Sequence, residues 1–142
     1  MKLTIATDFS NVTGLRHCAK SEKSGEEFYH TQLNPRFYEA LQAKEDLDLE
    51  LDGTLDSYAP SFLDEALGNL VYDFTLAVVK QRLHLHSSRN PSWIKMIEEE
   101  TYPQWESRRK ANEPRTVTAH HDDWYRRNSD GELEKGQWAG QN

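Results

Sequence analysis

The sequence predicts an α/β fold, and two observations carry this prediction. Some short segments alternate apolar with polar residues, which is typical of strands. Along the chain, these segments alternate with others of helical periodicity. Their order is strand, helix, strand, helix, strand, helix, which implies a sheet joined by crossover connections. With 142 residues, the chain is expected to build one domain around a single core.

The first strand and helix are predicted in residues 1–42. Leu3 and Ile5 alternate with polar neighbours, so residues 1–18 are expected to contain one or two short strands. Ser24 stands three residues before a glutamate, which is a capping-box signature for a helix start. Pro35 lacks an N–H and clashes with a preceding turn, so we expect the helix to break or restart at Asn34 and Pro35, with Asn34 capping the second half.

The central strand and helix occupy residues 47–74. Three leucines alternate with three acids from Leu47 to Asp52, which predicts a strand with one buried and one acidic face. The helix over 61–74 carries an almost unbroken apolar stripe. Ser61 is expected to cap this helix, with Asp64 completing a capping box and Pro60 just outside it.

The last strand and helix are predicted in residues 83–111. Leu83 and Leu85 alternate with His84 and His86, as in a short strand, and a helix then starts near Pro91. Pro103 is expected to break that helix before Trp105.

The composition changes after Ala111. Residues 112–142 are rich in Asn, Pro, Thr, Asp and Gly, and we interpret them as a C-terminal extension that forms a hairpin or a partly ordered tail. Val117 is expected in an edge strand, and residues 129–131 in a hairpin turn. Aromatic residues are expected to pin the extension to the body: Trp124, Tyr125 and Trp138.

The net charge of −7 is unevenly distributed. Residues 45–79 hold nine acids and no Lys or Arg, whereas the charges of the flanking segments nearly cancel. The simpler interpretation is a solvated acidic rim, and the sharper one is a surface for a basic partner. Either way, direct nucleic-acid binding is not expected, because this surface repels phosphates.

Other sequence features favour a cytoplasmic protein without catalytic chemistry. No apolar run is long enough for a bilayer, no signal peptide is visible, and the single Cys18 cannot form an intrachain disulfide. We find no P-loop, GxSxG or GxGxxG motif. Two basic segments flanked by aromatic residues, 105–110 and 124–127, are interpreted as a helix surface and an anchor rather than as contacts to a nucleic acid or an acidic partner.

The histidines offer a weak metal-site hypothesis. His84 and His86 share one side of a predicted strand, and the extension contributes a second cluster of metal-ligand types: His120, His121, Asp122 and Asp123. No fixed spacing joins the two clusters, so neither a metal nor another cofactor is expected.

Three motifs carry a resemblance to a known family. SGEEF (24–28), LDLELDG (47–53) and SFLDEALGNL (61–70) together resemble the STAS-like domain family of unknown function over residues 13–80. The resemblance implies a fold like that of bacterial anti-sigma-factor antagonists, a small sheet with helices packed mainly on one side. It assigns residues 1–111 to the STAS-like domain and leaves 112–142 as the extension.

The resemblance also implies a partner-binding surface. In the antagonists, the loop and helix start equivalent to 59–62 bind a kinase-like ATPase that phosphorylates a serine there. Ser61 matches the second serine of that motif, whereas Pro60 and Phe62 replace its first serine and its glycine.

These observations together predict a non-enzymatic regulatory module that binds a protein. The predicted contact residues are Asp56, Tyr58, Ser61, Asp64 and Glu65, with Tyr58, Asp64 and Glu65 exposed. The alternative is a phage or mobile-element effector of the anti-defence type, whose acidic face blocks a basic, nucleic-acid-binding complex.

Overall fold

Three parallel strands form the sheet of the computed structural model, which describes residues 1–138. They are β1 (Lys2–Thr4), β2 (Leu47–Glu50) and β3 (Leu83–His86), in the order β1-β2-β3, with Leu3, Leu49 and Leu85 in register. The α/β prediction is therefore confirmed. Residues 5–18 form no second strand, since β1 runs directly into the short helix α1 (Ile5–Asp8).

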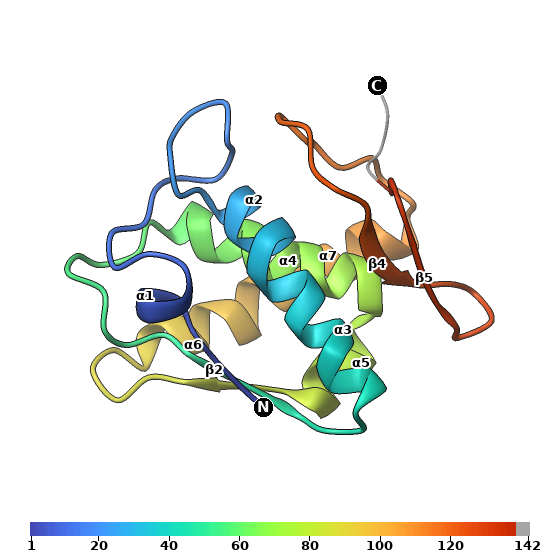
Figure 1. The fold of residues 1–142 in the computed structure, drawn as a ribbon, viewed down its shortest axis with the longest axis horizontal. Helices are drawn as coiled ribbons and strands as arrows, with labels where there is room; N and C mark the ends of the chain where they lie inside the picture. Colours follow the sequence, from blue (N-terminus) through green and yellow to red (C-terminus); the bar gives the residue numbers. More distant parts are fainter. Residues whose placement is uncertain (139–142) are drawn as a thin grey trace.

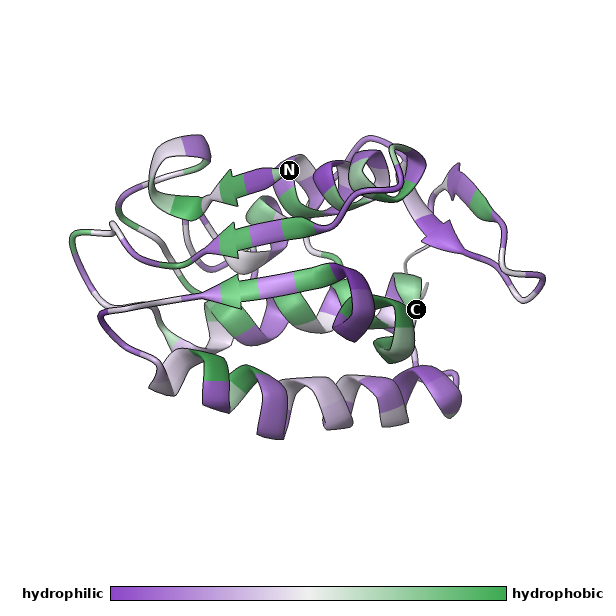
Figure 2. Cartoon of the chain, turned by 90° about the horizontal axis from the view of Figure 1, so that it is seen from below, coloured by the Kyte–Doolittle hydropathy of each residue, from purple (hydrophilic) through white to green (hydrophobic). Residues whose placement is uncertain are grey.

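The helices cover one face of this sheet. Figure 2 looks onto the other face, where the three strands lie open with the helices behind them. Leu47 and Leu49 of β2 are buried against the helices, whereas Asp48 and Glu50 alternate with them on the open face. The predicted one-sided packing and the acidic wet face of the strand are both present.

Helix α4 (Pro60–Phe74) passes through the middle of the molecule (Figure 1). Its apolar stripe is buried, as the periodicity predicted. The short helix α5 (Leu76–Arg82) follows at once and leads into β3. Thr75, between the two helices, has a φ of +77°, and its side chain accepts a hydrogen bond from the Val78 N–H at 3.4 Å.

The helices flanking α4 each contain a π-helical turn directly before a proline-bearing segment. One consists of α2 (Gly25–Phe28), η1 (Tyr29–Leu33) and α3 (Asn34–Gln42), and the other of α6 (Ser92–Met96), η2 (Ile97–Thr101) and α7 (Tyr102–Lys110). At the first proline, α3 begins at Asn34, which agrees with the predicted restart and not with a break, whereas the predicted break at Pro103 is wrong. In the π-helical turn before each proline, the hydrogen bonds join residues five apart instead of four. This wider turn accommodates the ring and the missing N–H without ending the helix.

The extension folds onto the body as a hairpin. β4 (Trp124–Arg127) pairs antiparallel with β5 (Leu133–Gly136), and Gly131 in the turn has a φ of +83°. Val117 lies in no strand, contrary to expectation. Trp124 is 2% exposed and belongs to the main hydrophobic core. The described part of the extension therefore completes the core instead of forming a separate tail.

Within residues 1–138, none of the helices combines the length and apolar character needed to cross a membrane.

Candidate functional site

The loops that follow the parallel strands meet at one edge of the sheet. The Leu55 N–H donates to the Asn11 carbonyl at 2.8 Å, which joins the loop after β2 to the segment after α1. Asp52 accepts from the Ser87 hydroxyl at 2.7 Å, which joins it to the loop after β3. Ligands commonly bind at the carboxyl edge of parallel sheets, because loops from several strands converge there.

The loops near this edge carry exposed aliphatic side chains. Leu55 is 73% exposed, Leu15 49% and Val12 47%, and no other large aliphatic or aromatic side chain of residues 1–138 is exposed to this degree. Val12 follows Asn11, which is bonded to Leu55, and Leu15 precedes Arg16, which reaches the start of α4. We call these three residues, together with Asp56 and Ser61, the carboxyl-edge surface.

Two small hollows flank the start of α4. One, of about 230 Å³, is lined on one side by Leu55 and Asp56 and on the other by Arg89 and Trp93. The other, of about 210 Å³, is lined by Arg16, Ser61 and Asp64 together with residues of η2 and α7. Both are below the usual range for small-molecule sites, and they suit single side chains of a partner better.

The predicted contact residues do not all lie on this surface. Asp56 is exposed, and Ser61 and Asp64 are half-buried. The prediction that Tyr58 and Glu65 are exposed is wrong. Tyr58 is 5% exposed and donates to the Leu51 carbonyl at 2.6 Å, while Glu65 is 4% exposed on the inner side of α4.

Ser61 is not the helix cap. Helix α4 begins at Pro60, the N-cap residue is Ala59, and no side chain caps the helix. Proline is well suited to the first helical position, since its φ is preset and it has no N–H to satisfy. The Ser61 hydroxyl makes no hydrogen bond to the residues that the structure describes, which leaves it available at the surface.

Most acids of the segment 45–79 lie beside a basic side chain or the N-terminal amine. The Asp46 carboxylate lies 2.8 Å from His84 and 2.9 Å from Arg82, and these hydrogen bonds, led by that of His84, hold its pKa below the usual range. Similar contacts pair Asp48 with His86, Asp64 with Arg16 and Asp73 with Arg115. Among residues 1–138, Asp56 has no ion pair and remains an exposed charge of the carboxyl-edge surface.

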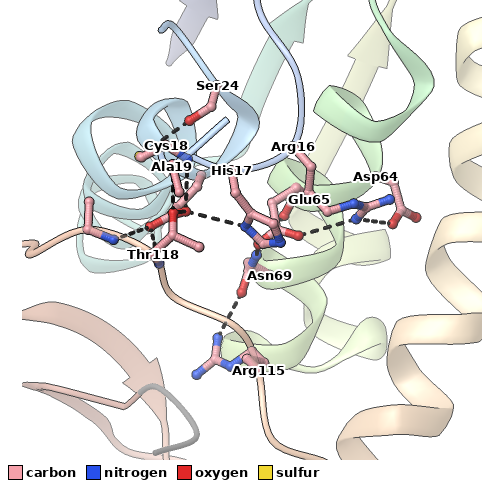
Figure 3. A network of polar contacts seen from close by, with 12 residues as sticks. Arg16, His17, Cys18, Ala19, Ser24, Asp64, Glu65, Asn69, Arg115 and Thr118 are labelled. Atoms are coloured by element: carbon pink, nitrogen blue, oxygen red, sulfur yellow. Dashed lines mark hydrogen bonds and ion pairs between the residues drawn. The ribbon is translucent and has the colours of Figure 1, made fainter. Parts of the chain in front are cut away.

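Glu26 holds the segment that carries Arg16. Its carboxylate is 1% exposed and accepts from the backbone N–H groups of Cys18, Thr118 and Ala119 at 3.0–3.2 Å. The Thr118 hydroxyl (2.6 Å) and His121 Nε2 (2.7 Å) also bond to it, and Figure 3 shows this network around Thr118. Burial raises the pKa of Glu26, but the hydrogen bonds, led by that of His121, outweigh it and hold the pKa well below its ordinary value.

A polar stripe on α4 continues this network across the molecule. Glu65, Asn69 and Asp73 are spaced four residues apart and therefore share one side of the helix. Asn69 Nδ2 donates to Glu65 at 2.8 Å, and Arg115 donates to Asn69 at 3.2 Å (Figure 3). Arg115 also pairs with Asp73 at 2.9 Å. Burial raises the pKa of Glu65 against the opposing effect of its neighbours His17, Asn69 and Arg16.

The histidines do not form the site that the sequence suggested. His84 and His86 pair with aspartates on the open sheet face, whereas His121 lies at the Glu26 network. Cys18, Glu26 and His121 bring three ligand-type atoms within 4.8 Å of one another. Both Glu26 oxygens already accept hydrogen bonds from backbone or side-chain donors, and burial raises the pKa of the Cys18 thiol. We therefore interpret these three residues as part of a structural hydrogen-bond network.

The sequence interpretation missed Glu26, Arg115 and the polar stripe. Glu26 lies inside the SGEEF motif, which was used only as a helix start, and Arg115 lies in the segment taken as a tail. The spacing of Glu65, Asn69 and Asp73 was visible in the sequence and was masked by the stronger apolar stripe of the same helix.

Residues 24–93 match the family model described as a STAS-like domain of unknown function (DUF4325). Searches of curated proteins and of solved structures found no match. The matched residues include α2 to β3, the loop with Leu55 and Asp56, and the whole of α4. Arg115 and the hairpin lie outside them.

Proposed function

Residues 24–93 of this chain are a STAS-like domain of unknown function, and from this premise we propose that the protein is a non-enzymatic regulatory module that binds a protein partner through its carboxyl-edge surface. The resemblance to the antagonists suggests a kinase-like ATPase as the partner. Because fold alone does not fix function, the proposal depends on the surface itself.

The exposure of Leu55 is the observation that carries the proposal. A leucine that is 73% exposed gains little from folding, and its N–H donates to Asn11, whose neighbour Val12 is a second exposed aliphatic residue. Burying such a group against a partner contributes about 25 cal/mol per Å² of apolar surface. The two hollows beside it provide seats for partner side chains, and Asp56 offers a charge to a basic group.

Ser61 gives this surface a point of control. Its hydroxyl lies at the second residue of α4, where a phosphate meets the positive end of the helix dipole and also the nearby carboxylate of Asp64. A charge added at Ser61 changes the hollow shared by Arg16 and Asp64, and we propose that it weakens partner binding.

Photo-crosslinking tests the proposed surface. A photoreactive residue is introduced at position 55, at position 12 and, as a control, at position 39, an exposed site on α3 at the other end of the sheet. After irradiation in a lysate of the native host, positions 55 and 12 are expected to capture the same protein, and position 39 is not. The same capture pattern from all three positions would contradict the proposal.

Point variants then measure the contribution of each group to binding of the captured partner. Leu55→Ser and Asp56→Asn are expected to weaken binding, while Glu39→Gln leaves it unchanged. Ser61→Asp is expected to weaken binding without unfolding the protein. Unchanged affinity in all three surface variants, with native circular dichroism, would rule out this face as the binding site.

The second candidate is the anti-defence effector with an acidic face. Glu98, Glu99 and Glu100 of η2 are exposed, and Glu100 lines the same hollow as Ser61, which extends the negative surface beside α4. Against this, most acids of residues 45–79 have cationic partners. Capture of a nucleic-acid-binding complex, from which nucleic acid then displaces the protein, would favour the second candidate function.

A further inference from the structure

A cleft lined by four arginines lies at the end of the molecule opposite the carboxyl-edge surface. It has a volume of about 810 Å³ and lies between the end of α4, the end of α7 and the hairpin. Its arginines come from both basic segments noted in the sequence and from the extension: Arg109, Arg115, Arg126 and Arg127. The fold thus brings together charges that are distant in a chain of net charge −7.

Arg115 is the most deeply buried of the four arginines. It is 3% exposed, its guanidinium pairs with Asp73 at 2.9 Å, and it lies over the Tyr72 ring at 4.2 Å. Its Nε is buried and has no hydrogen-bond partner among residues 1–138. A buried donor of this kind is costly to leave unpaired, and residues 1–138 supply no acceptor for it.

The ion pairs of the other arginines do not cancel the positive charge of the cleft. Arg109 pairs with Glu106 at 2.7 Å, and Arg126 pairs with Glu134 at 2.9 Å while stacking on Trp138. Arg127 is exposed and forms no ion pair with the part of the chain that the structure describes. Counting residues 1–138 alone, Glu106, Glu134 and Asp73 pair with three of the four arginines, and Arg127 adds an unpaired positive charge.

From this geometry we propose that the cleft binds a small molecule carrying two or more phosphate groups. Guanidinium groups present planar pairs of donors that match phosphate oxygens, and several of them around one cleft favour a ligand with several phosphates. The volume lies within the range of small-ligand sites. Asn128 and Ser129 add polar side chains at the mouth. The shared chemistry is the diphosphate, from an inorganic or a nucleoside source.

Calorimetric titration of the full chain tests this site independently of any protein partner. The probes are inorganic pyrophosphate, ADP and, for simple anion attraction, sulfate at matched ionic strength. Pyrophosphate is expected to bind and sulfate to bind far more weakly. Equal affinity for pyrophosphate and ADP assigns recognition to the phosphates alone, whereas tighter binding of ADP adds the nucleoside to the ligand.

The variants avoid Arg115, whose loss would disturb the core. Arg127→Gln is expected to weaken pyrophosphate binding at least about tenfold, the effect of one charge-assisted hydrogen bond. Arg126→Gln is expected to act in the same direction, with the hairpin checked by near-ultraviolet circular dichroism. Arg36→Gln, on α3 outside the cleft, serves as the matched control. Absence of binding, binding no tighter than that of sulfate, or an unchanged affinity of Arg127→Gln would overturn the proposal.

Discussion

Buried ionisable side chains in this protein are held by donors from segments far apart in the sequence. Glu26, on helix α2, accepts hydrogen bonds from Cys18 and from residues 118–121 of the extension. Asp73 accepts hydrogen bonds from Trp124 Nε1 at 3.1 Å and from the Tyr29 hydroxyl, and it forms an ion pair with Arg115. Removing water from a carboxylate is costly unless donors replace it, so each of these acids requires the extension to be in place.

His30 beside this network predicts a loss of stability in mild acid. Its ring stacks on His121 at 3.9 Å, and burial, with the charge of His121, lowers the pKa of His30 to about 3. The unfolded chain takes up a proton near pH 6.5, whereas the folded protein does not until about pH 3. The free energy of unfolding is therefore expected to fall as the pH drops from 6.5 to 3, by at most about 1.4 kcal/mol per unit.

His30→Gln removes this titration and tests the assignment. In urea unfolding at several pH values, the variant is expected to lose part of the slope between pH 6.5 and 4.5 that the wild type shows. Below about pH 4.5 both proteins should lose stability, because the pKa of Glu26 is lowered in the fold and the unfolded chain binds its proton first. Identical slopes above pH 4.5 would assign the acid sensitivity to other groups.

At the scale of elements, the sequence predicted strands and helices well and their starts less well. The alternation of Leu47, Leu49 and Leu51 and the stripe of α4 specify buried faces directly, so both elements could be predicted. Pro35 supports two opposite predictions, because proline breaks a helix interior but is favourable at a helix start. Only the packed structure shows that a π-helical turn resolves the conflict.

The two serines at predicted helix starts provide a matched pair. Ser24 is buried and its hydroxyl accepts from the Glu27 N–H at 3.1 Å, so Ser24→Ala is expected to cost about 1 kcal/mol. Ser61 caps nothing, so Ser61→Ala is expected to stay within about 0.5 kcal/mol of the wild type. Thermal or urea unfolding measures both, and a larger loss for Ser61→Ala than for Ser24→Ala would contradict the helix start at Pro60.

Close packing of α4 against α7 depends on Gly68. A Cβ added there would collide with the Trp105 indole, which is itself 3% exposed. Alanine normally favours a helix over glycine by about 1 kcal/mol, yet Gly68→Ala is expected to destabilise by about 1–3 kcal/mol through overpacking. Combining it with Trp105→Leu should cost less than the sum of the two single changes. Strict additivity in this double-mutant cycle would show that the two residues are not in contact.

At the scale of the whole molecule, the sequence led to a partner-binding surface at the start of α4, which stays a prediction, and it did not anticipate the exposed aliphatic residues there. Asp56, Ser61 and Asp64 lie around the start of α4 as the resemblance implied, while exposed leucines, not acids, are its most unusual feature. The extension could not be placed from sequence, because Arg115 and Trp124 show no periodicity that ties them to α4. Their partners become apparent only when Asp73 is seen to be buried.

The extension is therefore expected to be required for stable folding. Truncation after Ala111 removes Arg115, Trp124 and the residues of the extension that bond to Glu26, which leaves two buried carboxylates without most of their donors. We expect the truncated chain to lose its cooperative unfolding transition in urea. Arg115→Met in the full chain isolates one of these contributions and is expected to cost about 3–5 kcal/mol, the effect of leaving a buried charge unpaired. Changing Asp73→Asn as well removes the orphaned charge and should recover part of this loss. A cooperative transition of near wild-type stability in the truncated chain would show instead that residues 1–111 fold alone.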